Sequence, residues 1–86
     1  AIYVQRAEAA RKAVEEAELE VKRLTGQRTE IDRALFEPAS AAGSLKGATM
    51  SDLMKKRADV ERALAKAEER WLEASEALEE AEADAA

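Results

Sequence analysis

The side chains that most often carry out chemistry in proteins are scarce in this sequence. It has no His and no Cys, which removes the commonest general base, the commonest metal ligand and every thiolate. Its serines have no visible base beside them, and adjacent carboxylates such as Glu15–Glu16 are typical of solvated helix faces. The segment GSLKG at 43–47 is too short and wrongly ordered for a phosphate-binding loop. We therefore expect no catalytic residue, no metal, no cofactor and no enzyme activity in this chain.

Cationic side chains are the remaining source of chemistry, and their distribution is uneven. The whole chain has a net charge of −5, but residues 22–66 carry +4, while residues 1–21 and 67–86 carry −2 and −7. A basic surface of this kind attracts the phosphates of a nucleic acid. The candidate contacts are seven residues of the basic segment: Arg28, Arg33, Lys46, Lys55, Lys56, Arg57 and Arg62. For each of them other than Arg28 and Arg57, a solvated helix flank is the alternative and commoner interpretation.

Hydrophobic residues recur in two stripes at alternating intervals of three and four residues. The first stripe runs from Tyr3 to Leu35 and the second from Met50 to Ala81. Such spacing lines one face of a helix, and two such faces pack together as a coiled coil. Of the apolar residues, 21 are alanines. The larger apolar side chains that remain are too few for a compact single core. The sequence predicts an all-α fold, a two-helix antiparallel coiled-coil hairpin, with residues 1–86 as one domain.

The segment between the stripes predicts where the helices end. Pro38 cannot continue a helix interior, and Gly43 and Gly47 permit a reversal of the chain. Thr49, with Asp52 three residues later, is typical of a helix N-terminal capping box. We expect helices over about 2–36 and 50–83, joined by a turn over 37–48.

The pattern of large and small side chains also favours one register. When residues whose numbers add to 88 face each other, Leu24 lies opposite Leu64, and Trp71 lies opposite Ala17. Trp71 is then expected to anchor the core. Arg28 and Arg57 also fall on the stripes, where they either set the register or contact a ligand, and the sequence leaves both interpretations open.

Hydropathy bears on where the protein is located, and the first residue bears on whether the chain is part of a longer protein. The chain has no run of 18 apolar residues and no signal-peptide core, so we expect no membrane contact and a cytoplasmic location. It begins with Ala rather than Met, and we expect it to be a fragment of a longer protein.

Three segments carry a resemblance to a known family. They are LTGQRTEIDRALFEP at 24–38, KKRADVE at 55–61 and AEERWLE at 67–73. Together they resemble the C-terminal coiled-coil domain of the ABC-F ATPases, an antiparallel hairpin with a proline-containing turn, over about residues 8–80. The resemblance implies an accessory domain of a soluble bacterial protein that has two ATP-binding cassettes and works on the ribosome or on DNA. It also implies contacts around Arg28, Arg33 and residues 55–57, whereas none of the family's ATP motifs occurs here.

Two hypotheses of different classes follow from these observations. In the first, the chain is an accessory hairpin that binds DNA or RNA, ribosomal RNA included, weakly and without sequence preference, beside its parent ATPase domains. In the second, it is a structural spacer or a protein-interaction coiled coil that docks through Leu19 and Leu72 and has no contact with nucleic acid. In isolation we expect a monomer or a weak dimer.

Overall fold

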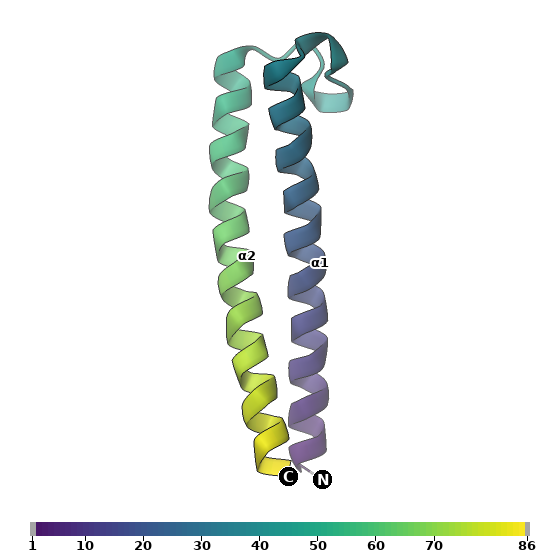
Figure 1. Cartoon of the computed structure of the whole chain (residues 1–86), viewed down its shortest axis with the longest axis vertical. Coiled ribbons are helices and arrows are strands. Elements are labelled where there is room, and N and C mark those ends of the chain that lie inside the picture. Colours follow the sequence, from purple (N-terminus) through teal and green to yellow (C-terminus); the bar gives the residue numbers. More distant parts are fainter. Residues whose placement is uncertain (1, 86) are drawn as a thin grey trace.

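The fold is an antiparallel helical hairpin, seen in a computed structural model that describes residues 2–85. Helix α1 (Ile2–Phe36) and helix α2 (Met50–Ala85) lie side by side, with both chain ends at the same end of the molecule (Figure 1). Two short 3₁₀ turns, η1 (Pro38–Ser40) and η2 (Gly43–Leu45), connect them. The molecule is a rod of 55 × 17 × 14 Å. The predicted all-α hairpin is confirmed.

The helix ends follow from local chemistry. The last turn of α1 closes with the Glu37 amide donating to the Arg33 carbonyl at 2.7 Å, and Pro38 then begins η1. At the start of α2, the Asp52 amide donates to the Thr49 hydroxyl oxygen at 3.1 Å, which satisfies one of the amides left free in a first helical turn. The Thr49 cap expected from the sequence is therefore present.

The connection is folded rather than extended. Gly43 and Gly47 have φ values of 60° and 78°, a left-handed conformation that residues with a Cβ rarely adopt. These two positions turn the chain so that Leu45 packs against the cluster formed by Ile31, Ala34 and Leu53. The connection therefore covers the end of the hydrophobic seam, and in Figure 1 it folds back beside the end of α1.

The core is a single stripe between the helices. One cluster of buried residues consists of Leu24, Leu64 and Ala67, and a second consists of Ile31, Ala34 and Leu53. The first cluster joins residues whose numbers add to 88, as the expected register requires. Towards the chain ends, the buried positions among the described side chains hold only alanines: Ala7, Ala10, Ala17 and Ala81. The contribution of buried apolar surface to stability is therefore concentrated in the half of the rod nearer the turn.

Two stripe positions differ from the sequence expectation. Met50 is 66% exposed, and Trp71 is 39% exposed, so the expectation that Trp71 fills the core opposite Ala17 is wrong. Small residues at Ala17 and Ala67 let the helices approach closely, which leaves no room for an indole between them. The ring lies on the flank instead, where its Nε1 donates to a Glu18 carboxylate oxygen at 3.2 Å. The side chain of Tyr3, another stripe position, lies outside the described part of the structure.

Over residues 2–85, neither helix contains a stretch apolar enough to cross a lipid bilayer.

Gly26 and Gly43 should respond in opposite ways to substitution by alanine. Gly26 lies within α1 with open space around its Cα, so Gly26→Ala should raise the free energy of unfolding by about 0.5–1 kcal/mol. Gly43 has a positive φ, so Gly43→Ala should lower that free energy by about 1–2 kcal/mol. Urea unfolding followed by circular dichroism measures both. Equal effects of the two substitutions would contradict this assignment.

Candidate nucleic-acid interface

The basic residues singled out from the sequence gather at the turn end of the rod. Arg33 lies in the last turn of α1, and Lys46 directly follows η2. The run Lys55–Arg57 follows the first turn of α2, at the same end of the molecule. Elements far apart in the sequence therefore bring these cations together, as the hairpin topology requires.

They do not form one flat surface. Consecutive residues of an α-helix point about 100° apart, so the three side chains of residues 55–57 spread over roughly 200° of the circumference of α2. Lys55 and Arg62 are seven residues apart and share one outward stripe, while Arg57 points toward α1. A ligand that contacts all seven cations at once would have to wrap around the rod.

Arg28 and Arg57 take part in a cross-helix ion-pair cluster, which also contains Asp32 and Glu61. The Arg57 Nε donates to Asp32 Oδ1 at 2.7 Å, and Arg28 Nη1 lies 3.3 Å from Glu61 Oε1. Arg57 Nη1 lies 3.5 Å from the same Glu61 oxygen. The hydrogen bond with Asp32, and then its negative charge, raises the pKa of Arg57. Each arginine head thus binds a carboxylate at the edge of the seam.

This cluster supports the register interpretation of the two stripe arginines. Both links join residues whose numbers add to 89, one away from the register of the buried cluster around Leu24 and Leu64. All four side chains are between 35% and 42% exposed, so their stems cover the seam while their charged heads reach solvent. A phosphate that binds Arg28 or Arg57 would compete with an existing carboxylate.

Arg62 is also paired, whereas four of the seven candidates are not. Arg62 contacts Asp59 one turn earlier on α2. Within residues 2–85, no ion pair involves the other four, and all of them are exposed: Arg33, Lys46, Lys55 and Lys56. These four cations are the ones whose charge is available to a ligand without first breaking a contact.

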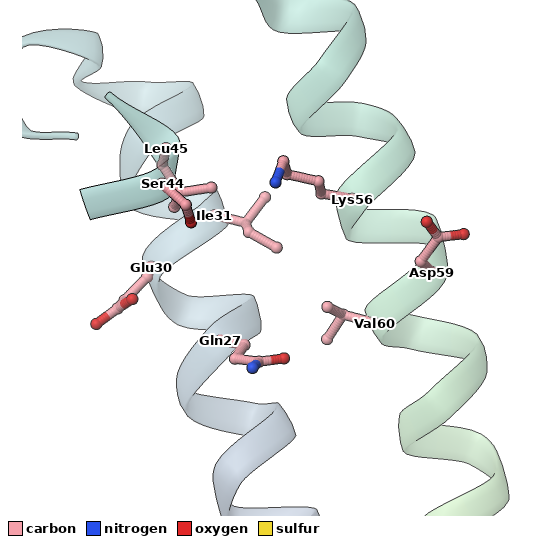
Figure 2. A pocket seen from close by; sticks show the side chains of 8 residues that line it. All are labelled: Gln27, Glu30, Ile31, Ser44, Leu45, Lys56, Asp59 and Val60. Carbon is pink, nitrogen blue, oxygen red and sulfur yellow. The ribbon is translucent and has the colours of Figure 1, made fainter. Parts of the chain in front are cut away.

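A cleft of about 330 Å³ lies among α1, η2 and α2 at this end (Figure 2). Its apolar lining comes from Ile31, Leu45 and Val60, and the Lys56 side chain extends from α2 toward α1. Its polar lining comes from Gln27, Glu30, Ser44 and Asp59. Two carboxylates at its rim oppose an anion inside the cleft, so it suits a small polar or cationic group better than a phosphate.

No sequence pattern predicts this cleft, because Ser44 and Leu45 line it only once the connection folds back. Of the seven candidates, only Lys56 lines it. No group of three or more acidic side chains within residues 2–85 is placed to hold a metal ion.

A second concavity, of about 610 Å³, lies halfway along the rod. We call it the mid-rod groove, and it is lined by Glu18, Val21, Lys22, Glu68, Trp71 and Leu72. Leu72 is 53% exposed there. Leu19, the other leucine expected to dock a partner, does not line the groove. Ala17 and Val21 lie on the face of α1 toward α2, and Leu19, two residues from each, lies on the opposite face. The spacing predicted that Leu72 lies on the surface, but it did not predict that Leu72 and Trp71 line one groove.

No family model, curated protein or solved structure matches this chain. The interpretation of these surfaces therefore depends on their own geometry and charge.

The cross-helix cluster should stabilise the hairpin more than the local pair on α2 does. Glu61→Gln removes the acceptor shared by two arginines and should lower the free energy of unfolding by about 0.5–1 kcal/mol. Asp59→Asn is the matched control, because it breaks an exposed pair within one helix and should cost about 0.2–0.5 kcal/mol. Urea unfolding of both variants at low salt tests this. The cost of Glu61→Gln should shrink in 1 M salt, where charges are screened over about 3 Å. A Glu61→Gln cost no larger than the control would refute a role in holding the helices together.

Proposed function

We propose that this hairpin is a non-catalytic accessory module that binds nucleic acid weakly and without sequence preference through its turn end. The observation that carries the proposal is the separation of charge along the rod. The segment around the turn, residues 22–66, carries +4, and the two segments that form the open end carry −9 together. A polyanion is attracted to the first and repelled by the second, so it meets the turn end first.

Four cations make this contact: Arg33, Lys46, Lys55 and Lys56. They come from the end of α1, the connection and the start of α2, and their charges are not engaged by carboxylates among the described residues. Long, exposed lysine and arginine side chains on a convex rod suit phosphates, which are read by charge alone, rather than base edges. Binding is accordingly insensitive to sequence.

The acidic open end limits the affinity of this contact. A nucleic acid that continues along the rod beyond the turn region meets residues 67–86, which carry −7. Short ligands that touch only the turn end escape this repulsion, whereas long ones must bend away from the rod. This is how a chain with a net charge of −5 still contributes to binding a polyanion.

We further propose that the hairpin is the C-terminal accessory domain of an ABC-F ATPase. The support is the resemblance carried by residues 24–38, 55–61 and 67–73, in which a proline-containing turn separates two antiparallel helices. Attachment of ATPase domains on the N-terminal side of α1 would join them to the acidic end and leave the basic turn end free to reach a nucleic acid, whether DNA or RNA.

Charge reversal at the turn end should weaken binding more than the same reversal at the open end. With four phosphate contacts, log K for a short DNA duplex should fall with log salt at a slope of about −3.6. The double variant Lys55→Glu/Lys56→Glu removes two contacts, so the affinity should drop and the slope should fall to about −1.8. Fluorescence anisotropy titrations at several salt concentrations measure both quantities.

The matched control is Arg11→Glu/Lys12→Glu, which makes the same change in net charge at two adjacent, exposed positions of the open half. It should leave the slope unchanged. Equal losses in the two double variants, or no measurable binding by the unaltered chain at low salt, would refute the turn-end contact and favour the spacer interpretation.

The family proposal has a separate test. We expect the gene that encodes this chain to specify two ATP-binding cassettes, each with a phosphate-binding loop, upstream of the codon for Ala1. Sequencing that region decides the matter, and any other upstream content would refute membership of the ABC-F family without affecting the turn-end contact.

A further inference from the structure

We propose that the mid-rod groove binds a second copy of this chain, in an antiparallel, side-by-side dimer of rods. The groove is the place where the hairpin exposes its largest side chain. Trp71 is 39% exposed and Leu72 is 53% exposed, and both lie beside the partly buried Val21. In a rod whose seam is built largely from alanine, this groove combines an aromatic ring with two aliphatic side chains.

The position of the groove along the rod makes it suitable for contact with itself. The midpoint of α1 is Leu19, and the midpoint of α2 falls between Ala67 and Glu68. The residues of the groove lie within a few positions of these midpoints. A two-fold axis through the groove and perpendicular to the rod therefore superposes the groove on its own copy while the two rods overlap over their full length.

Charge decides the direction of the second rod. With the two-fold axis at mid-length, the basic half around the turn of one copy lies along the acidic open half of the other. Residues 22–66 at +4 then face residues 1–21 and 67–86 at −9 in both halves of the dimer. A parallel arrangement would place −9 against −9. Opposite fields attract and like fields repel, so the antiparallel arrangement is favoured.

The rim of the groove carries charges of both signs. Glu18 and Glu68 are acidic, and Lys22 is basic. In an antiparallel contact of α1 with its copy, Lys22 of each rod comes near Glu18 of the other, because the two residues flank the midpoint of α1. The same pair would be out of reach of its copy in a contact that lies at either end of the rod.

The available area is sufficient. A side of the rod measures 55 by 17 Å, which accommodates the roughly 800 Å² per partner of a standard protein interface. Only the central part of that surface is apolar, so the dimer forms at micromolar or higher concentrations rather than at nanomolar ones.

The groove is tested by two matched substitutions. Leu72→Gln and Leu19→Gln each replace an exposed leucine of a helix by a neutral, helix-compatible residue, but only Leu72 lines the groove. Sedimentation equilibrium from micromolar to millimolar concentrations should show a dimer for the unaltered chain and for Leu19→Gln. Leu72→Gln should weaken that dimer about tenfold or more. Trp71 is the only tryptophan, so its emission should also shift to the blue as the unaltered chain dimerises.

The direction of the rods is tested on the unaltered groove. The chain has no cysteine, so Ser51→Cys provides a single exposed site for a nitroxide label at the turn end. In the antiparallel dimer, the two labels lie at opposite ends of the assembly, separated by close to the 55 Å length of the rod. A pulsed electron paramagnetic resonance experiment measures that separation.

Three results would overturn the proposal. A chain that stays monomeric at every concentration has no such interface. Equal weakening by the Leu19 and Leu72 substitutions would place the contact outside the groove. A label separation of less than half the rod length would mean that the copies meet in parallel or at their turns. Each of these results leaves the nucleic-acid contact untouched, because that contact is measured on turn-end variants.

Discussion

The whole structure depends on one narrow seam between two helices. A two-helix rod can bury only one stripe of each helix, and here that stripe is largely alanine. Two clusters, one around Leu24 and Leu64 and the other around Ile31 and Leu53, supply the large buried side chains. Because isolated helices are marginal in water, the stability of both helices comes mainly from this contact. The turn half of the rod is therefore the part where the helices are held most firmly.

Other features of the molecule reinforce the seam where it would otherwise end or slip. The connection packs Leu45 over the cluster that contains Ile31, which covers part of the end of the stripe. The ion-pair cluster of Arg28, Asp32, Arg57 and Glu61 lies beside the stripe between the two hydrophobic clusters. A shift along the seam would break these directional ion pairs as well as the apolar packing, so the charges add to the preference for one register over its neighbours.

The same narrow seam determines what the surface can do. A thin rod without a deep interior exposes most of its charged side chains, so long-range charge separation and shallow grooves are its means of recognition. In the proposed function the turn end offers cations to a polyanion, and in the proposed dimer the mid-rod groove offers an aromatic and aliphatic surface to a second rod. The two surfaces lie at different levels of the rod, and the proposed antiparallel dimer would bring the acidic half of one copy alongside the basic half of the other. The two proposed contacts would therefore draw on the same basic charge.

The sequence by itself determined the hairpin, its helix ends and its charge separation, because each depends on local pattern. Heptad spacing requires two facing helices, Pro38 and the Thr49 cap mark their ends, and a count of charges along the chain needs no coordinates. Only the tertiary structure decided which particular side chains are buried and which partners they contact. Trp71 occupies a stripe position by spacing, yet the close approach of alanine-lined helices excludes its ring and moves it to the flank. Which arginines bind carboxylates, and how Ser44 and Leu45 close a cleft, depend on distances across the hairpin that periodicity does not encode.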